Sequence, residues 1–180
     1  MLTITIPANE LFDPTTGIFT PIKETTITIE HSLIAVSKWE SKWKKPFLKE
    51  KTEMSFEMFS DYVRCMTITQ NVDSKVYKGL SKSNIDEIQE YMADPMTATV
   101  IKSKSKGSVQ KRFMTSELIY AYMAMLRIPY ECQKWHLNRL LTLIQVTSIE
   151  QEPPKKMSKS ETMNRHRSIN AARRAKHPHA

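Results

Sequence analysis

Metal-binding side chains come closest together at Cys132 and His136, which stand four positions apart. On a helix this spacing places both on one face, where a thiolate and an imidazole could bind the same zinc ion. A zinc site needs further ligands, and only Cys65 and His31, both distant in the sequence, are available to complete it. The pattern therefore favours a buried thiol beside Trp135 and a histidine at the edge of the core, with no metal bound.

Glu30, His31 and Ser32 carry the side chains of a hydrolytic triad. Neighbours in sequence point in different directions, whereas triad members converge from separated positions. Ser32 also precedes a helical pattern, which predicts that its hydroxyl caps a helix. The three glycines of the chain lie far apart, so the sequence has neither a P-loop nor a dinucleotide-binding turn. We therefore predict no enzyme activity, no metal and no cofactor.

Carboxylates repeat at a spacing of four at Glu53, Glu57 and Asp61, on one side of a predicted helix. Such a row of acids usually forms a solvated face, and a carboxylate metal site is the alternative. We expect the solvated face.

Aromatic and basic residues alternate around Trp39 and Trp43, which are surrounded by four lysines between residues 38 and 45. Both tryptophans continue the apolar stripe of Leu33 and Val36, so we expect them to contact the core or a protein partner. Stacking on nucleic-acid bases is the alternative. Met123 lies in a Met-rich helical segment, where flexible side chains either fill the core or line a groove for a peptide.

The order of the predicted elements gives an α+β chain that is mainly α. LTITI (2–6) and TTITI (25–29) alternate apolar and polar residues and are predicted to pair as strands. Asp13-Pro14 and Gly17 between them predict a turn within a second hairpin. We expect this β element to pack on a bundle of about five helices, followed by a basic C-terminal tail.

Helices are predicted wherever apolar residues recur at intervals of three or four. The first follows Ser32 and stops before Pro46. The other helices of the core are expected behind a cap at Thr52, from Ser83 to Asp94, from Ser116 to Leu126, and, as the longest, from about Tyr130 to Ile149. The stretch from Lys102 to Arg112 is expected to be an exposed loop.

The positive charge is concentrated at the C-terminal end. The chain has a net charge of +8, with 27 basic and 19 acidic residues. Residues 1–152 contain 19 basic and 18 acidic residues, a net of +1, and residues 153–180 contain 8 and 1, a net of +7. We therefore divide the chain into a core domain at 1–152 and a linker with a basic tail at 153–180, which is flexible or forms a helix stabilised by a partner. The tail residues expected to bind polyanions are Lys155, Lys156, Arg165, Arg167, Arg173 and Arg174.

The two cysteines, the absence of a secretory pattern and the absence of a long apolar run predict a soluble intracellular protein that has no membrane partner.

Two segments carry a family resemblance: IEHSLIAVSKWESKWKKPFL (29–48) and IPYECQKWHLNRLLTLI (128–144), the second followed by PPKKMSKSE. Together they resemble the tail assembly chaperones of long-tailed, siphovirus-type bacteriophages. The resemblance runs from the N-terminal strands to the PPKKMS linker.

The resemblance implies a protein of the host bacterial cytoplasm that binds the phage tape measure protein and helps recruit tail tube subunits during tail morphogenesis. It implies no catalysis, and it leaves open both homo-oligomer formation and a frameshifted longer form. The candidate partner-binding residues are Trp39, Trp43, Met123, Trp135 and His136. The alternative function is that of a phage protein that binds DNA or RNA through its basic tail.

Overall fold

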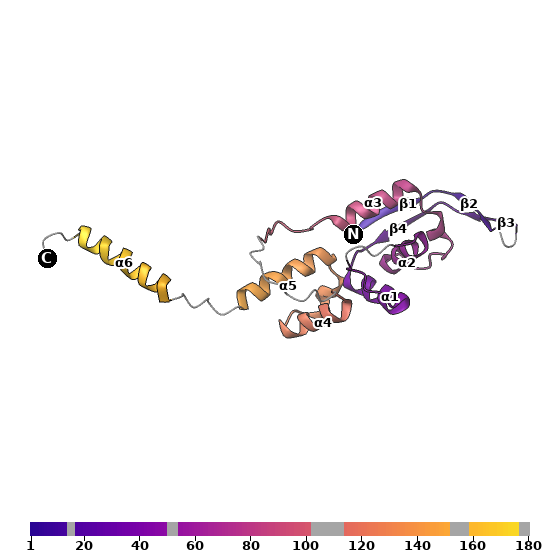
Figure 1. Ribbon diagram of the computed structural model, residues 1–180. Helices are drawn as coiled ribbons and strands as arrows, with labels where there is room; N and C mark the ends of the chain where they lie inside the picture. The colour runs from indigo at the N-terminus through magenta and orange to yellow at the C-terminus, as the bar shows by residue number, and fades with distance from the viewer. Residues whose placement is uncertain (14–16, 50–53, 102–113, 152–158, 177–180) are drawn as a thin grey trace. The chain divides into compact units, whose positions relative to one another are not determined.

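The computed structural model describes residues 1–13, 17–49, 54–101, 114–151 and 159–176. The chain divides into two units, Met1–Ile149, here called the core domain, and Glu150–Ala180, here called the tail unit. The described residues form four strands and six α-helices (Figure 1). This confirms the predicted fold class, α+β and mainly α.

The N-terminal residues form one long antiparallel hairpin with a short interruption. In its inner half, β1 (Leu2–Ile6) pairs with β4 (Thr25–Ile29), and in its outer half β2 (Asn9–Asp13) pairs with β3 (Ile18–Ile22). Leu2 lies opposite Ile29 and Asn9 opposite Ile22, so the register is the same on both sides of the interruption. The predicted strands and the second hairpin are confirmed, and Gly17 at the turn adopts a φ of 66°, which favours glycine.

The inner half of the hairpin has one buried and one exposed face. Its buried face consists of four isoleucines, Ile4, Ile6, Ile27 and Ile29. On the other face the hydroxyl oxygens of Thr3 and Thr28 lie 3.2 Å apart and those of Thr5 and Thr26 lie 3.0 Å apart. This alternation follows from the two-residue period of a strand, which places Ile4, Ile6, Ile27 and Ile29 on the core side.

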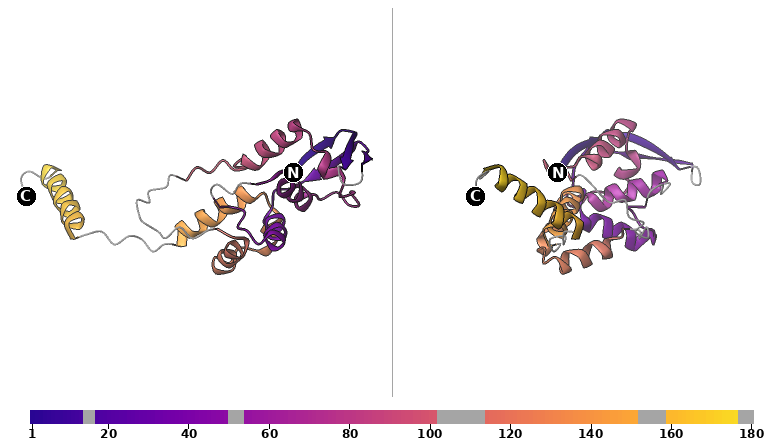
Figure 2. Two further views of the ribbon diagram at one scale, coloured as in Figure 1. Left: turned by 45° about the vertical axis from the view of Figure 1, so that its right-hand side comes forward. Right: turned by 60° about the vertical axis from the view of Figure 1, so that its left-hand side comes forward.

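The outer half of the hairpin packs on the core through a different part of its surface. Ile22 is buried and approaches Gly79, where an added Cβ would lie 2.9 Å from the Ile22 Cδ1 atom. Pro21, the neighbour of Ile22, has no N–H, so β3 is an edge strand that lacks one donor. Figure 2 shows the outer half extending beyond the helices.

The first two helices begin at serine caps. α1 (Leu33–Trp43) is capped by Ser32, as predicted, and α2 (Phe56–Met66) is capped by Ser55. The cap predicted at Thr52 lies outside the described residues. α1 packs on α2, and after α2 the amide of Ile68 donates to the Thr28 carbonyl on β4, at 2.9 Å. The chain therefore returns to the hairpin directly after its second helix.

A 3₁₀ turn, η1 (Val76–Gly79), leads into α3 (Lys82–Ala93). The helix predicted from Ser83 to Asp94 has its cap two residues before the predicted start, because Ser81 caps it and forms a capping box with Asn84. The side-chain amide of Asn84 also donates to the Thr5 carbonyl, with Nδ2 at 3.1 Å from the oxygen. The Asn84 side chain thus completes the capping box and attaches α3 to β1. This second bond explains why Ser81, and not Ser83, is the cap of the helix.

The longest predicted helix is interrupted. α4 (Ser116–Met125) agrees with its prediction, but the predicted helix from Tyr130 to Ile149 consists of a 3₁₀ turn, η2 (Tyr130–Lys134), and α5 (Leu137–Gln151). Between them Trp135 is extended, with ψ at 163°, and the Leu137 amide donates to the His31 carbonyl at 2.7 Å. Pairing with the chain before α1 therefore outweighs the helical preference of the sequence.

The tail unit contains α6 (Lys159–Lys176). All of its described side chains are exposed, including Arg165, Arg167, Arg173 and Arg174. Its two large apolar side chains, Met163 and Ile169, do not form a continuous stripe. The predicted loop at 102–112 lies outside the described residues.

Candidate partner-binding grooves

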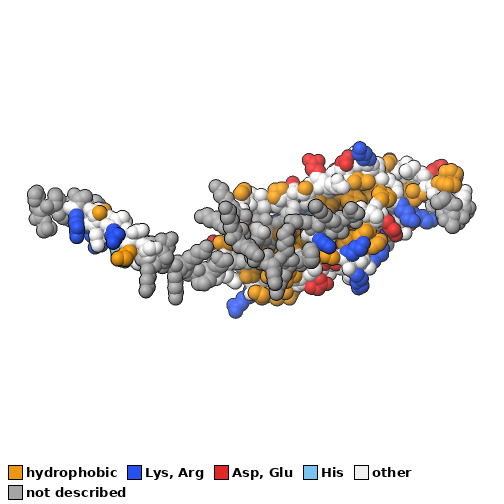
Figure 3. Space-filling view, viewed as in Figure 1, with side chains coloured by type: hydrophobic (Ala, Val, Ile, Leu, Met, Phe, Trp, Pro, Cys, Tyr) orange, Lys and Arg blue, Asp and Glu red, His pale blue; other side chains and the backbone are white. Residues whose placement is uncertain are grey.

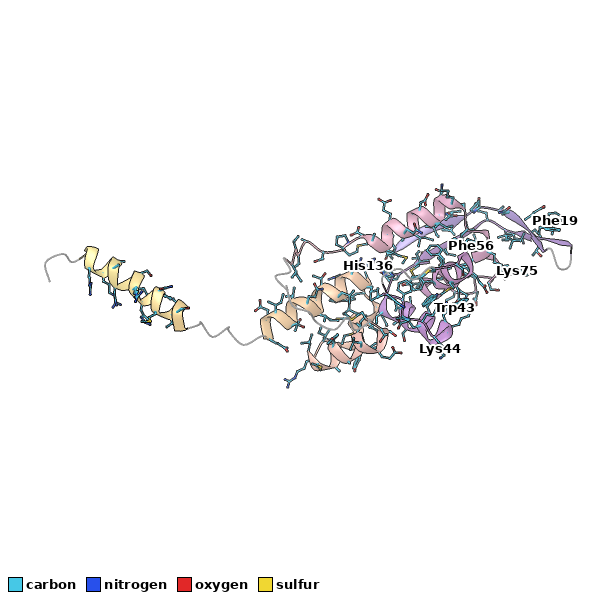
Figure 4. All side chains as sticks on the ribbon, in the orientation of Figure 1. Phe19, Trp43, Lys44, Phe56, Lys75 and His136 are labelled. Atoms are coloured by element: carbon cyan, nitrogen blue, oxygen red, sulfur yellow. The ribbon has the colours of Figure 1, made fainter. Side chains whose placement is uncertain are left out.

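Among the α-helices of the core domain, α2 carries the most exposed aromatic residue. Phe59, Val63 and Met66 point inward, whereas Phe56, the first residue of the helix, is 49% exposed. On a helical wheel Phe56 lies at the edge of the buried stripe, about 60° from Phe59. Figure 4 labels Phe56 on the hairpin side of the domain, away from His136. α2 is therefore a ridge with an aromatic side chain at its N-terminal end.

An apolar groove of about 320 Å³ lies between α2 and α3. We call it the α2–α3 groove; it is lined by Met54, Phe56, Phe59, Ile85, Gln89 and Met92. Gln89 is the single polar residue among the described residues of the lining, and Phe56 forms one wall. In Figure 3 hydrophobic side chains gather on the part of the surface where α2 and α3 lie.

A second groove, of about 540 Å³, lies on the other side of α2. We call it the α2–η1 groove; besides Phe56 and residues of α2, it is lined by Leu11, Lys42, Ser74, Tyr77 and Lys78. Its lining includes three basic side chains, Lys42, Arg64 and Lys78, and two acidic ones, Glu57 and Asp61. Phe56 lines both grooves, so the two meet at this ring.

Asp61 organises one wall of the α2–η1 groove. Its carboxylate accepts hydrogen bonds from Lys42 Nζ and from Trp43 Nε1, both at 2.8 Å, and forms an ion pair with Arg64 at 2.9 Å. Burial alone would raise the pKa of this carboxyl, but the hydrogen bonds from these three donors outweigh it and hold the pKa below its usual value. The prediction of a solvated acidic face is therefore wrong for Asp61.

Ser60 lines the α2–η1 groove with a buried hydroxyl. The residue is 6% exposed, and its Oγ has no hydrogen-bond partner within the described part of the chain. A buried hydroxyl without a partner is uncommon in native proteins, because the desolvated group loses its bonds to water. Ser60 is thus an unused donor and acceptor in the wall of this groove.

A third exposed apolar feature lies at the outer end of the hairpin. Phe12 and Phe19, paired across β2 and β3, are 55% and 60% exposed, and their ring centroids lie 4.9 Å apart. Figure 3 shows hydrophobic atoms at this end, and Figure 4 labels Phe19 there. This pair is on the hairpin face opposite to Leu11, which lines the α2–η1 groove.

Two histidines form the polar centre of the core domain. The rings of His31 and His136 lie edge to face with centroids 5.1 Å apart, and the Tyr62 hydroxyl is 2.6 Å from His31 Nδ1. His136 Nε2 donates to the Tyr91 carbonyl at 3.2 Å, and its Nδ1 has no partner among the described residues. The Tyr91 hydroxyl in turn donates to Glu30 Oε1 at 2.7 Å.

Burial keeps both histidines neutral. Desolvation, with a smaller contribution from His136, lowers the pKa of His31 to about 3, and desolvation also lowers the pKa of His136. Both residues are at most 6% exposed. This arrangement has no access for a substrate and serves the packing of the core.

Three of the five predicted partner-binding residues are corrected by the structure. Trp39 and Met123 have no exposed surface and His136 has 6%, so all three belong to the core. Trp39 donates its indole N–H to the Met58 carbonyl at 2.9 Å. Trp43 and Trp135 are partly buried, and Arg139 stacks over the Trp135 ring. Neither ring lines the grooves along α2.

The structure also places the residues considered for a zinc site and for a hydrolytic triad. Cys132 belongs to η2 and His136 lies beyond its end, so they do not share a helix face. Among the described residues no group of three or more His, Cys, Asp or Glu side chains is placed to hold a metal ion. The Ser32 hydroxyl accepts from the Ala35 amide as a helix cap, and the His31 ring contacts Tyr62 instead.

Sequence reasoning did not single out Phe56 as a binding residue. Its position at the edge of the stripe, one residue after a serine cap, was the available signal. The neighbours that form the grooves come from η1, α3 and β2, which no local pattern places beside α2.

Comparison of the chain with known protein families, with curated proteins and with solved structures finds no match. No helix in the described ranges has the length and apolar character needed to cross a bilayer.

Proposed function

We propose that this chain is a non-catalytic chaperone that binds apolar helical segments of another protein. The observation that carries the proposal is the exposed Phe56 ring, which joins two grooves along α2. Grooves of this kind accept the apolar face of an amphipathic helix, whose side chains at intervals of three or four reach the lining. A contiguous exposed apolar surface on a small domain is typical of such interaction sites.

The resemblance of residues 29–48 and 128–144 makes the proposal specific. We propose a tail assembly chaperone of a long-tailed bacteriophage that acts in the host cytoplasm, binds the tape measure protein and helps recruit tail tube subunits. A tape measure protein is long and largely helical, so it exposes many apolar segments before assembly. Several copies of a weakly binding domain would together stay bound along the tape measure protein, while each single copy could still dissociate during assembly.

Co-expression tests this function directly. A tape measure protein from a long-tailed phage is produced with and without the chain, and its soluble yield and co-purification are measured. Phe56→Asp should abolish the gain in soluble yield, because it places a charge where both grooves meet. Tyr130→Asp is the matched control, since Tyr130 is a similarly exposed aromatic residue outside both grooves. A tape measure protein that stays insoluble and unbound with the wild-type chain would contradict the proposal.

The tail unit supports a second candidate, binding of DNA or RNA. α6 presents four exposed arginines, and its sequence contains six basic residues and one acidic residue, Glu161. A basic helix of this kind neutralises phosphates, so its binding should weaken steeply with salt. Filter binding of the full chain and of a chain ending at Glu152 tests it. Equal nucleic-acid affinity of the two chains would contradict a role of the tail.

A further inference from the structure

The grooves on the two sides of α2 differ in charge although they share Phe56. The α2–η1 groove is lined by Lys42, Arg64 and Lys78 against Glu57 and Asp61. Asp61 is already engaged by two of these cations, at 2.8 Å and 2.9 Å, whereas the Lys78 side chain is exposed. The described lining residues therefore carry an excess of one positive charge.

Among the described residues, the α2–α3 groove has no charged side chain in its lining, but its α3 side is acidic. Asp86 and Glu90 follow the lining residues Ile85 and Gln89 by one position each, so they lie about 100° further round the helix, toward solvent. Both are exposed. Glu87 lies about 160° round α3 from Ile85 and Asp94 follows the helix. The described charges beside the groove are therefore Asp86 and Glu90 against Lys82, a net of one negative charge.

The unused Ser60 hydroxyl is the second observation that points to a ligand. It is buried in the lining of the α2–η1 groove and has no partner within the described ranges. Lys42, Trp43 and Arg64 donate to the neighbouring Asp61 carboxylate, and none of them bonds to Ser60. The Ser60 hydroxyl is therefore left for a polar or acidic side chain of a bound ligand.

We infer that the two grooves form one track for a helical segment of opposite charge at its two ends. The acidic end lies in the α2–η1 groove, near Lys78 and Ser60, and the basic end lies beside Asp86 and Glu90. Apolar side chains between the ends pack on both faces of the Phe56 ring. This inference rests on the proposed function and adds the charge pattern that selects the partner segment.

Charge complementarity at the rim of an apolar contact contributes mainly to selectivity and to the rate of association. Each exposed ion pair adds little binding free energy. A segment whose two ends have matching charges gains this energy at both sites, whereas a segment with the same charge at both ends gains it at one site and is repelled at the other. The track therefore discriminates among segments that have the same apolar stripe.

Fluorescence anisotropy of labelled peptides with the full chain tests the inference. Three helical peptides of about 18 residues share one apolar stripe and carry acidic and basic ends, two acidic ends, or two basic ends. The first should bind roughly tenfold more tightly than the other two, and this preference should shrink at high salt. The double variant Asp86→Lys with Glu90→Lys should transfer the preference to the peptide that has two acidic ends.

The matched control is Glu24→Lys with Glu131→Lys, which changes the net charge by the same amount at two exposed carboxylates outside both grooves. It should leave the order of the peptides unchanged. If the three peptides bind equally, or if the control changes the order as much as the groove variant does, the charge pattern is wrong.

Two further outcomes separate this inference from the proposed function. Equal binding of the peptides together with co-purification of the tape measure protein would overturn the inference alone. If no peptide binds and Phe56→Asp leaves co-purification unchanged, both fail. Sedimentation of the chain without peptide is measured in parallel, and self-association that disappears in Phe56→Asp would assign the track to a second copy and overturn the inference.

Discussion

α1 and α2 lie side by side and each buries a carboxylate, Glu40 and Asp61, but α2 also leaves an aromatic ring half exposed. α1 buries a carboxylate: Glu40 is 7% exposed and accepts from the Phe47 amide at 2.8 Å and from the Ser116 amide and hydroxyl at 2.8 Å and 2.6 Å. α2 leaves the Phe56 ring half exposed. Each placement costs free energy unless something compensates it. For Glu40 the compensation is inside the chain, and for Phe56 we place it in a partner.

Glu40 gives the largest expected effect on the buried side of this comparison. Glu40→Ala should lower the free energy of unfolding by about 3 kcal/mol, because three donors from two segments lose their acceptor. Glu40→Gln retains one acceptor oxygen and should cost about half as much. Urea denaturation measures both, and Glu131→Ala, an exposed carboxylate, is the control. A loss below 1 kcal/mol for Glu40→Ala would mean that the helix pair does not depend on this buried group.

Acid should destabilise the core domain through His31. Its pKa is about 3 in the folded chain against 6.5 in the unfolded chain, so the unfolded state binds the proton more readily between these values. Stability is complete above about pH 6.5 and is lost as the pH falls toward 3. At pH 5 the loss should be about 2 kcal/mol, and His136, with its lowered pKa, adds to it in the same direction.

The measurement is the urea midpoint between pH 7.5 and pH 4.5. Asp61 does not interfere, because its lowered pKa makes its contribution disappear only below its unfolded value of 3.8. His31→Gln should flatten the curve, and His166→Gln, an exposed histidine on α6, should not. A curve that is equally steep in His31→Gln would assign the acid sensitivity to other groups.

On the exposed side, Phe56→Asp should leave the fold intact and weaken partner binding. An acidic residue at the first position of a helix interacts favourably with the helix dipole, so the stability should change by less than about 0.5 kcal/mol. Affinity for the apolar peptides should fall roughly tenfold to a hundredfold, as for an aromatic residue at the centre of an interface. A fall in stability comparable to that of Glu40→Ala would make Phe56 a core residue and remove the contrast between the two helices.

Ser60→Ala should give the smallest effect and the most specific one. Removing a buried hydroxyl that has no partner should raise the free energy of unfolding by up to about 1 kcal/mol. The same change should weaken the peptide that has an acidic end by a few-fold, since its partner in the α2–η1 groove is lost. Thr147→Ala is the control, because that hydroxyl donates to the Leu143 carbonyl. Stabilisation without loss of affinity would mean that Ser60 does not contact the ligand.

The hairpin and most helices were predictable from sequence because local signals determine them. The alternation of LTITI and TTITI fixes the buried face, and Ser32 and Thr115 cap their helices as short polar residues usually do. The interruption of the helix at Trp135 was not predictable, since it depends on a bond to His31 about a hundred residues earlier. The grooves were missed for the same reason: Leu11, Tyr77 and Ile85 reach α2 only through tertiary packing.

The bond between the Leu137 amide and the His31 carbonyl also makes one proton a reporter of the whole domain. Leu137 and His31 are both buried, and they connect the start of the first helix with the start of the fifth. Because both partners are buried at the centre of the domain, deuterium exchange of this amide should require opening of the assembled core. The free energy of exchange calculated from the protection factor of this amide should therefore equal the free energy of global unfolding. Amides of α6 should exchange independently of it.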